Sequence, residues 1–554
     1  MATASKPRRK PEALRAADGR QAALFAAALP ELPVPAETSY EALSDSDFVR
    51  GDRARLYFCN ERLDVHLKRM RQNHVLRLAE WLENLEVAPL IKRYSRAGRK
   101  ALHPRLMLSL VLYGLTLGQR SLRDLERLAR LDLGAQWLCG GECPDHSTIG
   151  RFIALHQDDL GSVAFDEVLA ELSKHVSVDL GVGAADGTVI EAMTGRFAAL
   201  KAEALRDFAA EAWAQAESKE GDPDALKRVA LAQQALEEMT RRQAAAQGKG
   251  QDRKDKVRVS PVEPEAVVQK LKNSQDAAPA YKPSILANTQ RIILAQAMHP
   301  TSETAVLAGL WRDCGQRFGE TPKTLLADAG YHCGGVLSFV VDEGIDGLIP
   351  SGQRDRNGSC AKAGPKGKLG KREFVFDEAA GVYVCPGGRK LTVLDHGVDG
   401  RGLAYARYQV RDGGCADCAL RKRCQIGKEP RRITRYAHDG IADLMQTVLE
   451  QKAARRCYAK RQASVEPVFG ALRWQFGLTR FSRRGLRGAA LEFGLTAAAY
   501  NLVRGVRLEA LKTAAKRHFR RLWRSRRAPR ESAGRGPAPP LRAARVRAIR
   551  RPAP

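Results

Sequence analysis

The first third of the chain has the hydrophobic spacing of helices. Between Asp47 and about Asp179, LMLSLVLYGLTL carries apolar residues all round and predicts a buried helix, while SLRDLERLARLDL places leucines every three residues on one face. PDHSTIGRF opens with cap-forming residues and predicts another short helix. Short helices with Arg-bearing starts fit a helix-turn-helix DNA reader or a plain helical bundle, and the sequence leaves both open.

At Leu180 the pattern changes to short apolar runs bounded by glycine. GVGAADGTVIEA predicts a buried strand with Asp186 at or near its end, and KTLLADAGYHCGG predicts another strand that ends at Asp328. Two further strand runs lie in KPSILANTQRIILAQAMHP, and TSETAVLAGLWRDCGQRFG predicts a helix with Thr301 and Glu303 or Thr304 near its N-cap. The order predicts an α/β sheet with acids at its strand ends, where neighbouring strands converge.

Two segments interrupt this α/β pattern. Residues from about 194 to 256 are rich in Ala, Glu, Lys and Arg and break at GDPD, which predicts an inserted helical hairpin. Residues from about 353 to 434 are rich in Gly, Lys and Cys and predict a small β-rich insertion. Its Cys385, Cys415, Cys418 and Cys424 include a C-x2-C pair, so they form a structural zinc site or remain unliganded.

A long helix is predicted after Asp439 and runs through YAKRQASVEPVFGALRW. Pro467 should bend it, unless a new helix begins there. Between Tyr458 and Gly477, Glu466 is the single acid in a run rich in Arg and Lys, and Trp474 and Phe476 are predicted to be core residues. A final apolar helix, RGLRGAALEFGLTAAAYNLVRG, closes the core.

The charge of the chain is concentrated near its C-terminal end. Of the net +29, residues 421–487 hold +12 and residues 511–554 hold +14, which favours a polyanionic partner such as nucleic acid. The start of the chain is polar and basic, and no apolar run is long enough to cross a bilayer, so we expect a reduced, cytoplasmic protein without membrane association. Residues 1–46 and 509–554 are predicted to be disordered.

Two aspartates and one glutamate on separate elements are a common ligand set for magnesium, a hard cation that prefers oxygen donors. Asp186, Asp328 and Glu466 are such a set, with Glu191 as the main rival acid. Paired ions of this kind activate an attacking oxygen and stabilise the leaving oxygen in phosphodiester displacement.

The motifs LHPRLMLSLVLYGLTLGQRSLRDLERL, PDHSTIGRF, ADGT, LLADAGY and YAKRQASVEPVFG, in this order, resemble the DDE transposases of bacterial insertion sequences. The resemblance covers about 47–504. It implies an RNase-H-like fold in which Asp186, Asp328 and Glu466 bind metal, and a helix that carries a Tyr-Arg-Glu-Lys signature and holds transposon-end DNA. That signature corresponds to Tyr458, Arg461 and Glu466. Four residues rather than three separate Arg461 from Glu466, and Arg473 replaces the lysine.

The sequence therefore predicts an α/β protein with a helical N-terminal DNA-binding domain (47–179) and an RNase-H-like catalytic domain (180–508) that holds the two insertions. The expected function is a DDE transposase that binds the terminal inverted repeats of a mobile element, cleaves the DNA ends and joins them to target DNA, acting on the bacterial nucleoid. A metal-dependent nuclease of the same fold and a domesticated, inactive DNA-binding protein are the alternatives.

The expected cofactors are two Mg²⁺ or Mn²⁺ ions, with structural Zn²⁺ at the cysteines, and the expected assembly is a homodimer that pairs two ends. The residues expected to contact DNA are Tyr458, Arg461, Arg473, Arg480, Arg483 and Arg484.

Overall fold

The computed structural model describes residues 43–527 except for 97, 220, 248–254, 272–275, 352–367, 400–402, 412–414, 416 and 426–429; the side chains of 372 and 518–527 are also not described. The arm predicted at 1–46 and the tail predicted at 509–554 therefore lie mostly outside the described residues. Within these described residues, the chain from Asp45 onward forms one compact unit. Among the described residues, no helix is long and apolar enough to cross a membrane.

Short helices make up most of the N-terminal part of this unit. They are α2 (Leu63–Arg69), α3 (Asn73–Glu83), α4 (Ala88–Ile91), α5 (Pro104–Thr116), α6 (Leu122–Leu131), α7 (Leu133–Leu138), α8 (His146–Leu155) and α9 (Leu160–His175), preceded by the 3-10 turns η1 (Asp45–Asp47) and η2 (Arg53–Arg55). Ser121 and Asp145 cap α6 and α8 by accepting backbone N–H bonds, as their positions predict. The prediction of an all-helical region needs correction, because β1 (Tyr57–Phe58) and β2 (Glu61–Arg62) form a small hairpin around Cys59, whose φ is +53°.

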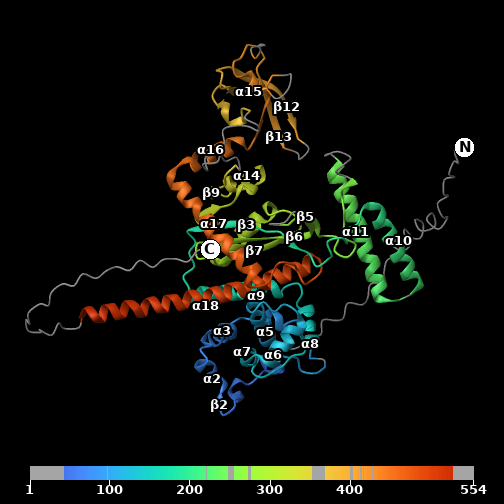
Figure 1. The fold of residues 1–554 in the computed structure, drawn as a ribbon, viewed down its shortest axis with the longest axis vertical. Coiled ribbons are helices and arrows are strands. Elements are labelled where there is room, and N and C mark those ends of the chain that lie inside the picture. The colour runs from blue at the N-terminus through green and yellow to red at the C-terminus, as the bar shows by residue number, and fades with distance from the viewer. Residues whose placement is uncertain are drawn as a thin grey trace, which may run out of the picture. The chain divides into compact units, whose positions relative to one another are not determined.

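The N-terminal helices and the sheet share one hydrophobic core. The last helix, α18 (Gly485–Arg527), packs along α9 in this core, and both are visible in Figure 1. At their crossing, a Cβ added to Gly494 would lie 2.9 Å from the carbonyl oxygen of Gly161, so the two backbones touch. Small residues at this point allow a close approach that larger side chains would prevent.

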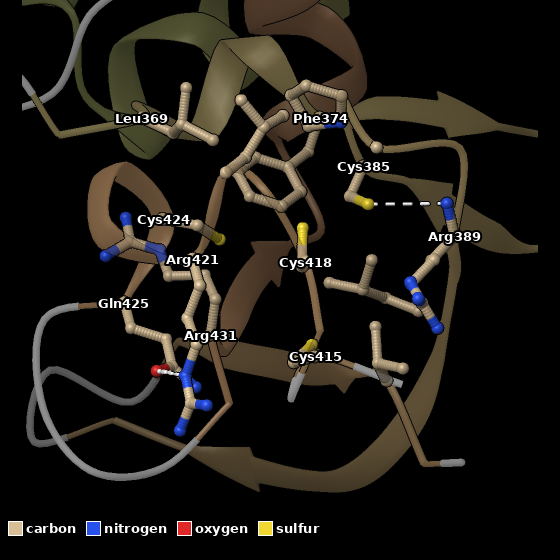
Figure 2. Close-up of a pocket in the computed structure, with 15 residues that line it drawn as sticks. Leu369, Phe374, Cys385, Arg389, Cys415, Cys418, Arg421, Cys424, Gln425 and Arg431 are labelled. Carbon is tan, nitrogen blue, oxygen red and sulfur yellow. Dashed lines mark hydrogen bonds between the residues drawn. The ribbon is translucent and has the colours of Figure 1, made fainter. Parts of the chain in front are cut away.

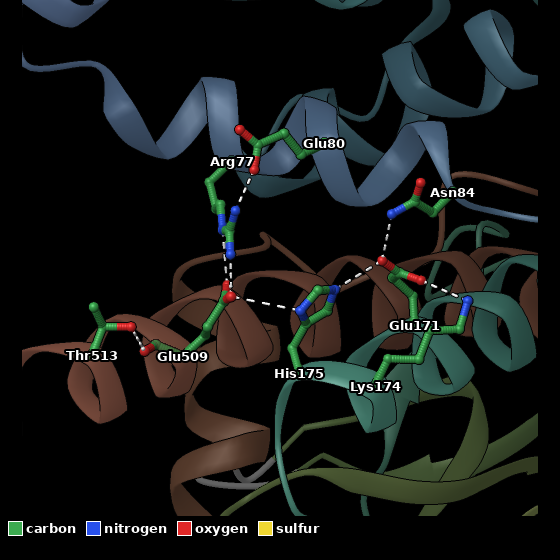
Figure 3. A network of polar contacts seen from close by, with 8 residues as sticks. All are labelled: Arg77, Glu80, Asn84, Glu171, Lys174, His175, Glu509 and Thr513. Atoms are coloured by element: carbon green, nitrogen blue, oxygen red, sulfur yellow. Dashed lines mark hydrogen bonds and ion pairs between the residues drawn. The ribbon is translucent and has the colours of Figure 1, made fainter. Parts of the chain in front are cut away.

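A polar network also joins α3, α9 and α18 (Figure 3). The buried carboxylate of Glu171 accepts bonds from Asn84 at 2.8 Å and from Lys174 at 2.9 Å, and it contacts His175 at 2.9 Å. His175 also lies 3.5 Å from Glu509 of α18, which pairs with Arg77 of α3. Because its oxygens have partners, Glu171 can remain buried without an isolated charge.

The central sheet is mixed and contains seven strands: β3 (Val182–Gly187), β4 (Ile190–Glu191), β5 (Val267–Lys270), β6 (Ala277–Asn288), β7 (Ile293–His299), β8 (Thr324–Leu326) and β9 (Asp346–Leu348). β6 pairs antiparallel with β3, β4, β5 and β7, whereas β3, β8 and β9 run parallel. The crossovers use η3 (Thr304–Val306), α13 (Leu307–Phe318), η4 (Ala329–Tyr331) and α14 (Gly334–Asp342). The fold is therefore mixed α/β, as predicted.

Two helices, α10 (Ala202–Ser218) and α11 (Pro223–Gln247), stand between β4 and β5 and pack against each other (Figure 1). Leu200 and Val259 exchange backbone hydrogen bonds of 2.9 and 3.0 Å at the base of this pair. Leu205 and Met239 belong to a small core of the pair's own. The segment thus leaves the sheet and returns to it at neighbouring points.

The cysteine-bearing segment forms a separate antiparallel sheet with its own small core. Its elements are η6 (Lys371–Glu373), β10 (Val375–Asp377), β11 (Val382–Val384), β12 (Lys390–Val398), β13 (Ala404–Gln409), α15 (Arg421–Cys424) and β14 (Ile433–Tyr436). The strands follow each other in chain order across the sheet, so each forms contacts mainly with its neighbours in sequence.

The C-terminal helices differ from prediction in three respects. The helix expected after Asp439 is divided at Gln451 into α16 (Asp439–Glu450) and α17 (Lys452–Trp474), and Pro467 lies inside α17 rather than starting a new helix. The final helix, α18, continues to Arg527, well into the tail predicted to be disordered. Trp474, predicted to be in the core, is 85% exposed, whereas Phe476 is fully buried.

Candidate active site

Asp186 and Asp328 lie at the same edge of the central sheet. β3 and β8 run parallel, with Ala184 opposite Leu326. Asp186 lies two positions beyond Ala184 and Asp328 lies two positions beyond Leu326, so the two aspartates are at the same level. Asp328 follows β8 and accepts a 2.8 Å bond from the N–H of Gly330, which fixes its carboxylate in the turn. The sequence predicted this placement from the apolar runs that precede the two acids.

Arg461 of α17 lies between the two aspartates. Its Nη2 atom is 3.1 Å from Oδ1 of Asp186 and 3.7 Å from Oδ2 of Asp328, and the side chains of Arg461 and Asp186 are only 13% and 14% exposed. α17 is held in this position by Val465, Val468, Phe469 and Leu472, which are buried at helical spacing. A residue expected to contact DNA thus pairs with two predicted metal ligands.

Glu466 does not join this group. It is exposed, and its Oε2 accepts a 3.1 Å bond from Gln462 of the same helix. Helical residues are separated by about 100°, so five positions place Arg461 and Glu466 roughly 140° apart around the helix axis. The spacing that departs from the familiar signature therefore has a physical result: Arg461 and Glu466 cannot both face the aspartates.

Asp186 has an unusual electrostatic environment. Burial, with smaller contributions from the charges of Asp328 and Glu303, raises the pKa of Asp186 to about 6, although Arg461 opposes this shift. Its Oδ1 accepts one backbone bond, of 2.9 Å, from Gly187. Crowded, partly desolvated carboxylates of this kind are typical of sites where a cation or a proton is held.

Glu303 also belongs to this site, although the sequence pattern placed it at a helix cap. It precedes η3 but makes no side-chain cap bond. A Cβ added to Gly187 would lie 2.6 Å from Oε2 of Glu303, and one added to Gly330 would lie 3.0 Å from its Oε1. Gly187 and Gly330, which follow Asp186 and Asp328, therefore leave room for the carboxylate of Glu303. These two glycines were the feature of the sequence that could have indicated a further side chain at this site.

The chemistry of these residues fits a divalent cation, because carboxylate oxygens are the donors that hard cations prefer. Asp186 and Asp328 already flank one positive group, the guanidinium of Arg461. In the part of the chain that the structure describes, however, no three His, Cys, Asp or Glu side chains are close enough to hold an ion together. Asp186 and Asp328 could supply two ligands, and a third must move toward them.

The basic residues predicted to contact DNA have varied surroundings. Arg473 donates to the hydroxyl of Thr188 and, at 3.1 Å, to the carbonyl of Val189, just beyond β3. Arg480 donates at 3.0 Å to the carbonyls of Ala192 and Thr194. Burial lowers the pKa of Arg483, whereas Arg484 is exposed and Tyr458 is half-buried against the core. Arg473 thus braces the residues just beyond β3, and Arg480 braces those that follow β4 (Ile190–Glu191).

The four predicted zinc ligands line one pocket with Leu369 and Phe374 (Figure 2). A Cβ added to Gly387 would lie 3.6 Å from the sulfurs of both Cys385 and Cys418. Cys385 accepts a 3.3 Å bond from the N–H of Arg389. Burial, together with the neighbouring thiols, raises the pKa of Cys415. The thiols share one site, but they too are not close enough to hold a metal in the described residues.

Comparison with known families identifies two regions. Residues 384–506 are similar to the family described as a transposase DDE domain. Residues 64–155 are similar to a transposase domain of the DUF772 family. The first region includes Arg461 and Glu466, and Asp186 and Asp328 lie outside both. Comparison with curated proteins gives no match.

Proposed function

Because the chain is an insertion-sequence DDE transposase, an enzyme that cleaves DNA and transfers strands, we propose that its catalytic centre is the sheet edge where Asp186 and Asp328 meet Arg461. The observation that carries this proposal is the position of one Arg461 nitrogen within 4 Å of both carboxylates. It brings together residues that are 133 positions or more apart in the sequence. Glu466 is the third proposed ligand, and because it is exposed and bonded to Gln462, it would have to turn toward the aspartates when Arg461 leaves them.

The proposed core is RNase-H-like. This is supported by the mixed sheet in which antiparallel β6 borders the parallel strands β3, β8 and β9, with the acids at the ends of central strands. Divalent metal is general for this family, and we infer that it is Mg²⁺ or Mn²⁺, as two ions. Bound there, the metal would polarise the phosphodiester and favour ionisation of the attacking oxygen.

The residues of the chain have separate roles in this proposal. Asp186 and Asp328 position the cation, and Arg461 balances their charge until DNA and metal arrive. Arg484, which is exposed, and Tyr458 lie on segments that could follow a phosphate backbone, while Arg473 holds the residues just beyond β3 and Arg480 holds those just beyond β4. The DNA substrates are the terminal inverted repeats and target DNA, and two chains pair the two ends as a homodimer.

Replacing the aspartates tests the assignment. Asp186→Asn and Asp328→Asn should each reduce cleavage of end DNA with Mg²⁺ by at least about 100-fold, because a carboxamide is a poor ligand for a hard cation. Glu191→Gln is the matched control, since Glu191 lies close to β3 but pairs with Arg196 at 2.9 Å. Cleavage by the Asp186→Asn variant at the unsubstituted rate would contradict the proposal.

The same assay separates the two alternatives. A nuclease of this fold would cleave end DNA without joining the 3′ ends to a second duplex, whereas a domesticated DNA-binding protein would bind ends without cleaving them. Joined products that require Asp186 would exclude both.

We also propose that Cys385, Cys415, Cys418 and Cys424 bind a structural zinc ion. The proposal is supported by their position around one pocket and by the N–H bond to the sulfur of Cys385, which stabilises a thiolate. Purified chain should contain about one zinc per molecule, and Cys418→Ser should lose it. Metal-free protein with unchanged thermal stability would exclude this site.

A further inference from the structure

We propose that Glu303 is a ligand of the same divalent cation as Asp186 and Asp328. This inference rests on the proposed function and changes its set of metal ligands. The sequence assigned Glu466 as the third ligand beside the two aspartates, and the inference adds Glu303 to them. Glu303 is a half-buried acid, with its side chain 14% exposed, and it makes no side-chain capping bond at the start of η3.

The position of Glu303 is the first argument. One carboxylate oxygen of Glu303 lies near Gly187, beside Asp186, and the other lies near Gly330. A Cβ added to Gly330 would lie 3.0 Å from Glu303 Oε1 and 2.9 Å from Asp328 Oδ1. Glu303 and Asp328 thus approach the same small volume from different loops. Any side chain at Gly187 or Gly330 would displace them.

Two buried hydroxyls are the second, independent argument. Tyr331 and Ser284 are fully buried, and neither hydroxyl has a hydrogen-bond partner among the described residues. An added Cβ at Gly187 would lie 3.0 Å from Ser284 Oγ, and burial together with the charges of Glu303, Asp186 and Asp328 raises the pKa of Tyr331. Unpaired buried hydroxyls are costly, so their position around three acids indicates a polar ligand such as a hydrated cation.

The charges at the site are the third argument. Three carboxylates, Asp186, Asp328 and Glu303, are matched by two cations, Arg461 and Lys282, the latter 3.0 Å from Glu303. Among the ion pairs of the described residues, one negative charge therefore remains unmatched. When DNA phosphates draw Arg461 away, two negative charges remain, which a divalent ion would neutralise.

Mn²⁺ binding to the full-length chain, measured from the electron paramagnetic resonance signal of the free ion, tests the inference. Glu303→Gln should weaken Mn²⁺ binding at least about tenfold, as should Asp186→Asn. Glu343→Gln, at an exposed acid paired with Arg312, is the matched control and should bind as the unsubstituted chain does. Lys282→Gln should retain or strengthen binding; equal weakening by Lys282→Gln would mean that Glu303 acts only through its ion pair and would overturn the inference.

The outcomes separate this inference from the proposed function. If Glu303→Gln binds Mn²⁺ normally while Asp186→Asn does not, Glu303 is not a ligand and the proposed site stands. If neither variant loses binding, both fail. Should Glu303→Gln not fold, Fe²⁺ with ascorbate and peroxide in the unsubstituted chain gives a second readout. Backbone cleavage near 186, 303 and 328 supports the inference, and cleavage that spares the region around 303 overturns it.

Discussion

At the scale of single residues, the direction of each side chain decides its role at this site. The sequence predicted that Asp186 and Asp328 end neighbouring strands, because apolar runs before a polar residue identify strand ends. It did not predict Glu303, because the contacts that define this residue come from glycines 116 positions before it and 27 positions after it. Trp474 was assigned to the core on its residue type, although its helical phase turns it outward.

His156 gives a residue-scale prediction. It is fully buried between Tyr94 and Phe152, with Asp159 and Arg93 nearby, and burial lowers its pKa to about 4. Below pH 6.5 the unfolded chain binds a proton that the folded chain does not bind until about pH 4, so stability falls as the pH falls through this range. The loss attributable to His156 is about 2 kcal/mol at pH 5.

Denaturant unfolding at pH 7 and pH 5 measures this effect. His156→Phe keeps an aromatic ring and should lose less stability between these pH values than the unsubstituted chain. His396→Phe, at an exposed position of β12, is the control for the same substitution at the surface. Equal pH dependence in all three proteins would show that His156 is not held neutral by burial.

At the scale of elements, hydrophobic spacing identified most helices and strands, while their ends depended on contacts that the pattern does not contain. The break at Gln451 between α16 and α17 has no glycine or proline to mark it. Conversely, Pro467 is tolerated inside α17, where buried residues before and after it keep the helix on the core. Packing thus overrides local preference in both places.

The contact between α9 and α18 gives an element-scale prediction. Gly494→Ala would place a methyl group 2.9 Å from the carbonyl oxygen of Gly161, so the helices must separate, at a cost of about 1–3 kcal/mol. Gly309→Ala in α13, where an added Cβ meets nothing within 4 Å, should instead be neutral or stabilise by up to about 1 kcal/mol. Thermal unfolding of the two variants compares them directly, and equal melting temperatures would contradict this account of the crossing.

At the scale of the whole molecule, the predicted boundary at 179/180 separates a mainly helical region from the strands of the central sheet. It does not separate two hydrophobic cores. Trp81 and Leu82 of α3 share one hydrophobic core with Val182 and Ala184 of β3. The sequence could predict the change of pattern but not this shared core, because burial between distant elements leaves no local signal. The helical pair α10–α11 is different, since Leu205 and Met239 belong to a core of its own.

Removing that pair is the whole-molecule prediction. If residues 201–258 are replaced by Asn-Gly, Leu200 and Val259 can be joined as a two-residue hairpin, since they already exchange backbone hydrogen bonds. The shortened chain should lose helical circular dichroism but keep cooperative unfolding and Mn²⁺ binding. As a control, Leu205→Asp in the complete chain should unfold only the helical pair. Insoluble shortened protein would show that the pair is needed for the fold of the sheet.

The closed base of α10–α11 also affects the rate at which the sheet assembles. Glu191 of β4 and Val267 of β5 both align with Ala280 of β6, so both ends of the insertion must reach β6 together. If the helical pair forms first, the flexible loop that must close shrinks from about 75 residues to about 16, which saves about 1.4 kcal/mol of chain entropy. Helices of this length form within microseconds. The insertion therefore lets strands distant in sequence meet at nearly the entropic cost of a local contact, and β4–β6–β5 should assemble about tenfold faster than it would with an unstructured insertion.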